Sequence, residues 1–423
     1  MRAARPLLLI LLLAAAAGCD REGDAPDGRG QAGLREHLDA LAKIAARSGG
    51  TRAAGTAGYA GSLDYVQARL TDAGWRVRRQ SLRYPYFRER SAELAAAGEQ
   101  LENGPHFRVL SYSGSGRAAG RVRRFGQACG RAALASLRPG QLPLVRRGGC
   151  FFRVKAAAAE RAGAAALLVA DDPGGRGAPS ATLGAPGSSI PVLVLAGREA
   201  EDMRTGSRVK LAVDAVSERR ITANLVAETR GGGGESVVMA GGHLDSVPAG
   251  PGLNDNGSGV AALIEVAEEV GPRPPGAPIR LAFWAAEELG LVGSRRYVAS
   301  LGKAERRRIA AYVNLDMVGS PNAVVTVYED GDPRLAAVLR RALGGARGER
   351  AGGASDHAPF AEAGIPVGGI YTGSVEPGPG GEPRDPCYHQ PCDTRANVNL
   401  EVLGRISAAV ERALLDLSRR GGR

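Results

Sequence analysis

The sequence contains few aromatic residues and no apolar stretch long enough to cross a membrane. Phe, Trp and Tyr make up 4% of its 423 residues. The longest apolar stretch has 11 residues, whereas a membrane-spanning helix needs about 20. Lys and Arg (55) exceed Asp and Glu (44), but the arginines are spread along the chain with few aromatics between them. The positive charge therefore does not indicate a nucleic-acid partner.

The N-terminus is typical of an export signal. Two arginines precede the apolar stretch, which ends in Ala-Ala-Gly-Cys at residues 16–19. This ending resembles a bacterial lipobox, in which Cys19 would carry a lipid after cleavage before it. Ordinary cleavage after a small residue would instead leave Cys19 free. We expect a signal peptide at 1–18, a polar linker at 19–31, and a membrane-anchored lipoprotein on the periplasmic or extracellular face of the cell envelope.

Cysteine is scarce, and its spacing suits an exported protein. Beyond Cys19, four cysteines cluster in pairs along the chain. Of the three possible pairings, the natural one joins Cys129 to Cys150 and Cys387 to Cys392. Oxidising surroundings would allow both disulfides to persist. Four buried free thiols are the alternative.

The order of apolar segments predicts an α/β protein with an insertion. After residue 221 strands and helices alternate, which indicates an open sheet covered by helices on both faces. Within 105–220, short apolar runs separated by Gly and Pro indicate a β-rich module. The expected helices are 33–47, 58–73, 152–161, 257–270, 332–343 and 400–417, and the main expected strands are 75–82, 209–213, 221–229, 236–241, 279–285, 312–317 and 324–328. One domain would therefore comprise 32–104 and 221–423.

Histidine and acidic side chains follow the predicted strands, where an open α/β sheet places its ligand site. In His243-Leu-Asp245 two side chains lie on the same side of an extended segment, so one can bind a metal that the other orients. The Gly-rich loop around Asp255 lacks the Lys-Ser/Thr pair of a nucleotide loop. An acidic residue just before a predicted helix better suits a metal.

Three further motifs carry ionisable side chains in apolar or constrained surroundings. Glu287 and Glu288 directly follow a buried strand, where neighbouring carboxylates repel unless a cation lies between them or one accepts a proton. Asp316 lies within an apolar strand, and buried unpaired carboxylates are rare. His389 lies in a short loop between two cysteines.

In combination, these five motifs resemble the secreted two-zinc aminopeptidases, the group of aminopeptidase Y and bacterial leucyl aminopeptidase. The resemblance covers nearly all of the chain after residue 32, including Arg-Ala-Ala-Gly-Thr at 52–56. It implies a zinc exopeptidase-like fold, with a mixed open sheet, whose catalytic domain is formed by 32–104 and 221–423. It also implies two Zn²⁺ ions and peptide substrates with a free N-terminus.

The resemblance assigns a role to each motif residue. Asp255 would bridge both ions, and the other ligands would be His243 and Asp316 on one ion, and Glu288 and His389 on the other. Two Zn²⁺ would nearly balance three carboxylates and a hydroxide, so the cluster could be buried. Such ions lower the pKa of a bound water and polarise the scissile carbonyl.

Three further residues would complete the implied site without being metal ligands. Glu287 would be the general base, taking the proton of the water and passing it to the leaving amine. Tyr388 would help to hold the developing oxyanion, and Asp245 would support His243.

The insertion resembles a second family. Residues 144–152 and 162–166, with Lys155 between them, resemble the protease-associated (PA) domain. That resemblance implies a lid or partner surface at 105–220 and no catalytic residue.

Alternatives to an aminopeptidase share the fold. A carboxypeptidase would need a basic cluster for the substrate carboxylate, and a glutaminyl-cyclase-like enzyme would have a one-zinc site. An inactive binding homologue would have lost some of the metal ligands.

Three histidines lie outside the motifs. His37 and His106 are expected to be ordinary surface or core residues, whereas His357 would either line the substrate cleft or be structural.

Overall fold

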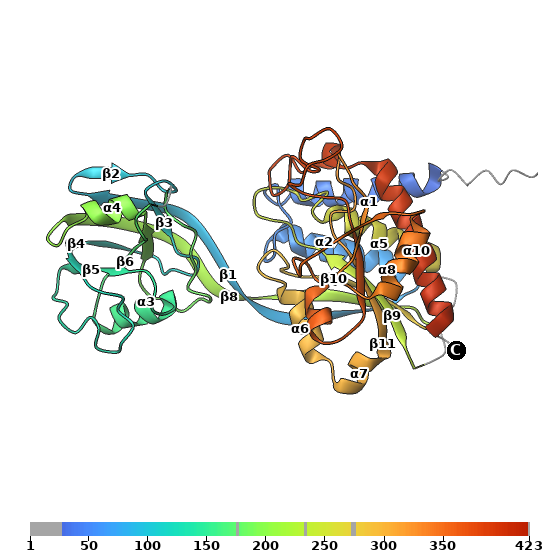
Figure 1. The fold of residues 1–423 in the computed structure, drawn as a ribbon, viewed down its shortest axis with the longest axis horizontal. Coiled ribbons are helices and arrows are strands. Elements are labelled where there is room, and N and C mark those ends of the chain that lie inside the picture. The colour runs from blue at the N-terminus through green and yellow to red at the C-terminus, as the bar shows by residue number, and fades with distance from the viewer. Residues whose placement is uncertain (1–27, 175–176, 232–234, 272–275, 422–423) are drawn as a thin grey trace, which may run out of the picture.

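The computed structural model describes residues 28–174, 177–231, 235–271 and 276–421, which form two lobes joined by a two-stranded ribbon (Figure 1). The ribbon consists of β1 (Arg76–Ala96) and β8 (Arg208–Glu228), each 21 residues long. These strands pair antiparallel along their whole length, with one irregularity between Glu89 and Ser91. One end of the ribbon belongs to the sheet of each lobe, so a single hydrogen-bonded sheet runs through the molecule.

The larger lobe is built on a mixed sheet whose central strands are parallel. Its strand order is β13-β12-β14-β11-β9-β10-β8. β14, β11, β9 and β10 run parallel, whereas β12 and β8 are antiparallel to their neighbours β14 and β10. The strands are β9 (Val237–His243), β10 (Ile279–Trp284), β11 (Ile309–Leu315), β12 (Thr326–Tyr328), β13 (Arg347–Glu349) and β14 (Val367–Tyr371).

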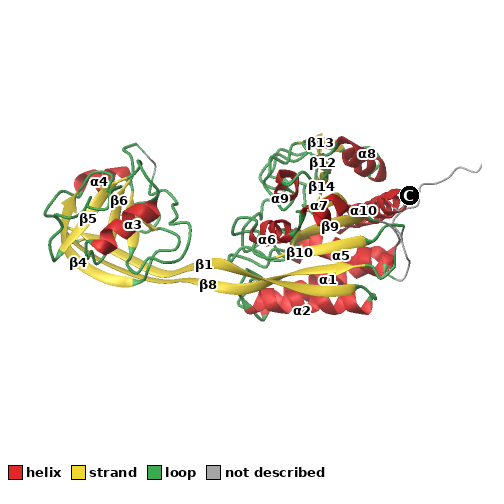
Figure 2. Ribbon diagram, turned by 90° about the horizontal axis from the view of Figure 1, so that it is seen from below, coloured by secondary structure: helices red, strands yellow, loops and turns green. Residues whose placement is uncertain are grey.

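Helices cover both faces of this sheet, as predicted (Figure 2). One face packs against α1 (Gly28–Ala46), α2 (Ala57–Asp72), α5 (Gly257–Val270), α8 (Pro333–Ala342) and α10 (Leu400–Gly421). The other face carries α6 (Val292–Ser300), α7 (Lys303–Arg308) and α9 (Ala358–Glu362). The short 3₁₀ turn η1 (Arg395–Asn397) lies just before α10 in the chain. On that second face Trp284 packs near Tyr297 and Phe360, and each buried aromatic contributes about 1.5–3 kcal/mol to stability.

The smaller lobe is the predicted β-rich module. Its sheet continues from β8 in the order β4-β5-β6-β7-β3. Its elements are β2 (Glu99–Leu101), β3 (Phe107–Val109), β4 (Gly116–Arg124), β5 (Gln141–Arg146), α3 (Phe152–Arg161), β6 (Leu167–Ala170), β7 (Val192–Leu195) and α4 (Gly197–Asp202). The disulfide Cys129–Cys150 lies in this lobe and Cys387–Cys392 in the larger one, so both predicted pairs are present.

The ribbon is the main difference between the expected and observed elements. The helices 152–161 and 257–270 have the predicted bounds, but 209–213 and 221–229 are parts of one strand, β8. Position 220 therefore lies inside a continuous strand, and the division at 104 and 220 stays a prediction. None of the helices in the described ranges has the length and hydropathy needed to cross a membrane. The expected signal peptide, Cys19 and residues 19–27 of the expected linker lie outside the described residues. Residues 28–31, which were also expected in the linker, instead form the start of α1.

Candidate active site

The parallel strands bring the predicted site residues to one edge of the sheet. His243 is the last residue of β9 and is paired with Trp284, the last residue of β10. Asp316 directly follows β11, and Glu287 and Glu288 follow β10 in the next loop. Because parallel strands end at the same edge, residues far apart in the sequence become neighbours here.

Asp255 reaches this edge from the loop that starts α5. The side chain of Asn256 caps the helix by accepting a hydrogen bond from the Gly259 N–H at 3.0 Å, and it donates to the Leu315 carbonyl at 2.8 Å. A Cβ at Gly259 would lie 2.6 Å from that same carbonyl. Glycine is thus required for α5 to begin against the end of β11. Close packing explains this glycine, and a phosphate-binding role for the loop is not needed.

The carboxylate of Asp255 lies between two imidazoles. Its Oδ1 is 3.2 Å from His243 Nε2, and its Oδ2 is 3.1 Å from His389 Nε2. His243 Nε2 also lies 3.2 Å from Asp316 Oδ1, whereas His389 Nε2 lies 3.2 Å from Glu288 Oε2. The five side chains therefore form two histidine–carboxylate pairs on opposite oxygens of one shared carboxylate.

Asp245 contacts the site through both its backbone and its side chain. His243 Nδ1 is 3.0 Å from the Asp245 carbonyl oxygen and 3.9 Å from its carboxylate. The carboxylate accepts a hydrogen bond from the Glu287 N–H at 3.1 Å. Asp245 thus supports the His243 ring mainly through its carbonyl and the Glu287 loop through its carboxylate.

Two carboxylate-centred contacts were not anticipated from the sequence. Asp393 accepts hydrogen bonds from the backbone N–H groups of Asn254 (2.8 Å) and Asp255 (3.0 Å), which fixes the Asp255 loop. The Ser355 hydroxyl donates to Asp316 Oδ2 at 2.6 Å. The only sequence signal was position, since Asp393 follows the second cysteine of the His389 loop and Ser355 precedes Asp-His.

Arg52 is a further residue whose role is visible only in the fold. Its side chain is completely buried, and it donates to the carbonyls of Pro251 (2.8 Å) and Gly252 (2.6 Å). Burial lowers the pKa of its guanidinium to about 10. Arg52 therefore ties the start of the chain to the loop that precedes Asp255.

Burial and mutual repulsion dominate the electrostatics of the site. Burial, reinforced by Asp356 and Asp316, raises the pKa of Glu287 well above its usual range. Burial and the neighbouring Asp255 raise the pKa of Glu288 to about 7. Hydrogen bonds to Asp255 and Glu288 raise the pKa of His389 to about 10. The cluster thus holds more negative charge than its own side chains neutralise.

The backbone at and beside the clustered residues adopts conformations that non-glycine residues rarely occupy. Ala286, Met317 and His389 have φ values of 55°, 51° and 58°. Each precedes, follows or is one of the clustered residues. Such conformations cost free energy and persist only where surrounding structure imposes them, which is common at functional sites.

A cavity of about 210 Å³ opens beside the cluster. Asp316 and Tyr388 border it, and the ring of Tyr388 stacks on His389 with centroids 3.9 Å apart. The remaining lining includes His357, whose ring lies 4.7 Å from that of Tyr328. His357 therefore lines the cavity, and a role in a substrate cleft stays a prediction.

Comparisons with known proteins agree on one family. The sequence profile of peptidase family M28 matches residues 224–414, and that of the PA domain matches residues 112–203. An aminopeptidase of Pseudomonas aeruginosa is 35% identical, with 87% of this chain and 77% of that protein aligned. The probable lipoprotein aminopeptidase LpqL of Mycobacterium tuberculosis is 36% identical, over 90% of this chain and 83% of that protein.

Solved structures support the same assignment. BSAP, a zinc aminopeptidase from Bacillus subtilis, has 25% identity and a TM-score of 0.65, covering 94% of this chain and 96% of that chain. A glutaminyl cyclase of Porphyromonas gingivalis shares the fold more distantly, with 16% identity, a TM-score of 0.52, and coverage of 92% and 98%. The chain therefore belongs to peptidase family M28 and is an exopeptidase of the zinc aminopeptidase type with an inserted PA domain.

Proposed function

We propose that the Asp255 cluster holds two zinc ions and removes N-terminal residues from peptides. The main observation behind this proposal is that the two oxygens of the Asp255 carboxylate each face a different histidine–carboxylate pair. A single ion would not explain why His243 and His389 face opposite oxygens of Asp255. One ion would lie between His243, Asp316 and Oδ1 of Asp255, and the other between His389, Glu288 and Oδ2.

The donor set fits zinc. Imidazole nitrogens and carboxylate oxygens are usual zinc ligands, and catalytic zinc sites leave a position for water or substrate. The Glu288 Oε1 atom and the Asp245 Oδ2 atom are buried without a hydrogen-bond partner. Buried carboxylate oxygens in this state are costly unless a cation compensates them.

The protein's own residues would divide the remaining chemistry. Zinc, when bound, supplies a Lewis acid that lowers the pKa of water and polarises a carbonyl. Glu287 would accept the proton of the attacking water and deliver it to the leaving amine. The Tyr388 hydroxyl, at the edge of the cavity, would donate a hydrogen bond to the oxyanion. Asp393 and Asp245 would hold the loops that carry these groups.

The test uses a panel of aminoacyl-nitroanilides and the same compounds with an acetylated amine. Free-amine substrates should be hydrolysed, a chelator should abolish the activity, and zinc should restore it. Acetylated substrates should react far more slowly, because an aminopeptidase requires the free N-terminus. Equal rates for both sets, or activity that withstands complete zinc removal, would contradict the proposal.

We also propose that Cys19 is lipidated and anchors the exported protein to a membrane. The lipobox-like residues 16–19, the two disulfides and the lipoprotein name of the M. tuberculosis relative support this proposal. Cys19→Ala should move the protein from the membrane fraction to the soluble fraction of the producing cell. Fractionation identical to that of the parent would exclude a lipid on Cys19 as the anchor.

A further inference from the structure

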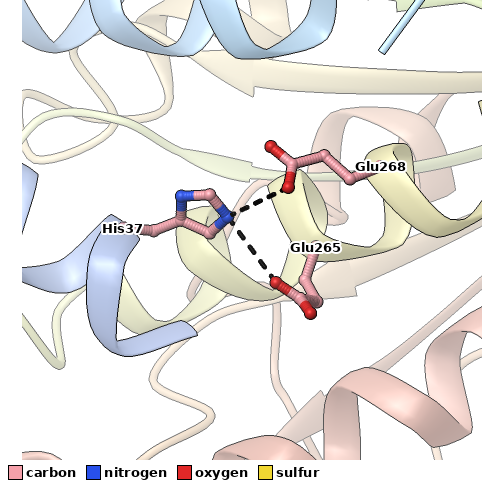
Figure 3. A group of neighbouring side chains, drawn as sticks. All are labelled: His37, Glu265 and Glu268. Atoms are coloured by element: carbon pink, nitrogen blue, oxygen red, sulfur yellow. Dashed lines mark ion pairs between the residues drawn. The ribbon is translucent and has the colours of Figure 1, made fainter. Parts of the chain in front are cut away.

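A second group of one histidine and two glutamates lies where α1 meets α5, outside the peptidase site (Figure 3). His37 belongs to α1, and Glu265 and Glu268 belong to α5. His37 Nε2 is 3.6 Å from Glu265 Oε2 and 3.9 Å from Glu268 Oε2. One ligand atom from each residue lies within 4.8 Å of the others, and the three side chains converge on a common point.

These separations suit a shared ion better than hydrogen bonds. An N–H···O hydrogen bond usually spans about 2.7–3.2 Å. Two ligands that bind one zinc ion tetrahedrally at about 2.0–2.2 Å lie about 3.3–3.6 Å apart, so the Glu265 contact fits directly and the Glu268 carboxylate would have to move a few tenths of an ångström closer. His37 Nε2 and Glu265 Oε2 are both buried and both lack a hydrogen-bond partner. Their spacing leaves them unsatisfied unless a cation lies between them.

The His37 ring is oriented as a metal ligand. Its side chain is completely buried, and its Nδ1 lies 2.8 Å from the Tyr65 hydroxyl. Metal-binding histidines generally donate their second ring N–H to an oxygen, which fixes the tautomer. If the Tyr65 hydroxyl accepts from Nδ1, the lone pair of Nε2 faces the two carboxylates. The lone pairs of His37 Nε2 and of one carboxylate oxygen from each glutamate then face one another, as the ligands of a metal ion do.

The charged side chains around the cluster have a net negative charge that a divalent cation would neutralise. Arg69 donates to both carboxylate oxygens of Glu268, at 2.7 and 3.0 Å, and to Glu36 at 2.6 Å. Glu36, Glu265 and Glu268 give three negative charges against one positive charge, which leaves two negative charges. The side chains of Glu265 and Glu268 are 14% and 29% exposed, so an ion and a coordinating water can enter from solvent.

A glycine on α1 makes space for this arrangement. A Cβ at Gly33 would lie 2.2 Å from Glu265 Oε2. Glycine inside a helix costs about 1 kcal/mol relative to alanine. Its presence four residues before His37 allows the Glu265 carboxylate to approach α1 closely.

We propose that His37, Glu265 and Glu268 bind a further zinc ion, with water as its fourth ligand, which fastens α1 to α5. Glu265 lies eight residues after the first residue of α5, roughly 12 Å along the helix from the turn beside Asp255. The ion is therefore separate from the peptidase site, and its expected effect is on the docking of α1. The proposal does not depend on how many ions Asp255 helps to bind.

The experiment compares zinc content between the full chain and variants after dialysis against zinc and then against zinc-free buffer. Glu265→Gln preserves shape but removes a ligand, and it should lower the content by one zinc per chain. The kcat for an aminoacyl-nitroanilide should stay within about twofold. Asp39→Asn is the matched control, because it removes a carboxylate of the same helix that pairs with Arg395 and does not belong to the cluster or to its charge balance, and it should keep the parent content.

Gly33→Ala gives an independent measurement, because it retains all three ligands but displaces the Glu265 carboxylate. It should also lose one zinc per chain. The difference from the parent is informative whether the peptidase site holds one ion or two. Equal zinc content in the parent, Glu265→Gln and Gly33→Ala would overturn the proposal and leave a metal-free histidine–carboxylate cluster as the explanation.

Discussion

The two lobes bury charge in different ways. Within the described part of residues 105–203, the buried polar side chains are Ser113 and Lys155. Lys155 is satisfied, because its ammonium donates to the carbonyls of Gln127 and Gly148 beside the Cys129–Cys150 disulfide. In the larger lobe, buried carboxylates and imidazoles instead face one another at the strand ends.

This difference separates structural from functional charge. A buried charge with complete hydrogen bonding can stabilise a small core, whereas neighbouring like charges destabilise a fold and are retained where chemistry requires them. Substitutions at the buried charges of the strand ends should therefore impair catalysis, whereas substitution of the buried charge of the smaller lobe should impair stability.

The largest expected effect is on turnover. Glu287→Gln keeps the size of the side chain but cannot accept a proton, so kcat should fall about 10²- to 10⁴-fold. KM should change little, and zinc content should match the parent. Steady-state kinetics combined with metal analysis tests this prediction. Loss of zinc in this variant would mean that Glu287 is a ligand rather than the base.

The neighbouring glutamate should behave in the opposite way. Glu288→Gln removes a charged partner of His389, which lies 3.2 Å away, and should weaken binding of one zinc at least about tenfold. Activity should partly return at excess zinc, which Glu287→Gln should not show. Zinc titration of both variants distinguishes the two roles, and a variant that retains all its zinc would reverse them.

The two disulfides should show the same division between lobes. Replacing Cys387 and Cys392 by serine frees the loop of His389 and should lower kcat/KM about tenfold to a hundredfold, since small displacements of catalytic groups are costly. Replacing Cys129 and Cys150 should lower the free energy of unfolding by about 3 kcal/mol, with kcat unchanged. Denaturant unfolding and steady-state kinetics on both double variants test this contrast. Equal losses of kcat/KM in the two variants would contradict it.

The smallest expected effect concerns Lys155. Lys155→Met leaves the buried carbonyls of Gln127 and Gly148 without their charged donor, so stability should fall by about 2 kcal/mol. Turnover of a small substrate should not change. Lys210→Met, at an exposed position in the same lobe, is the matched control and should be nearly neutral. A loss of kcat in Lys155→Met would show that the lobes are coupled.

Local patterns were sufficient for much of the fold. The helices 152–161 and 257–270 and the parallel strands around His243 and Asp316 were predictable, because apolar periodicity and buried strands leave clear signals. The length of β1 and β8 was not predictable. The middle of the ribbon, residues 88–91 of β1 and 216–221 of β8, contributes no side chain to the cores of the two lobes, so no continuous hydrophobic pattern marks either strand.

The site shows the same limit. Its motif residues could be identified, since their combination along the chain is specific, and the structure brings His243, Asp255, Glu288, Asp316 and His389 together. Asp393 and Ser355 were missed as supports because their partners are backbone groups or side chains 39 to 139 residues away. Arg52 begins the Arg-Ala-Ala-Gly-Thr motif at 52–56, yet its carbonyl partners are about 200 residues away in the sequence.

Sequence alone determined which side chains could carry the chemistry, because residue type fixes what can bind a metal or accept a proton. Only the tertiary structure decided which oxygen of Asp255 faces which histidine, because that depends on the register of parallel strands and on loops held by distant residues. The same holds for His37. In the sequence it is one histidine outside every motif, and packing of α1 against α5 places it opposite two glutamates that no local pattern connects to it.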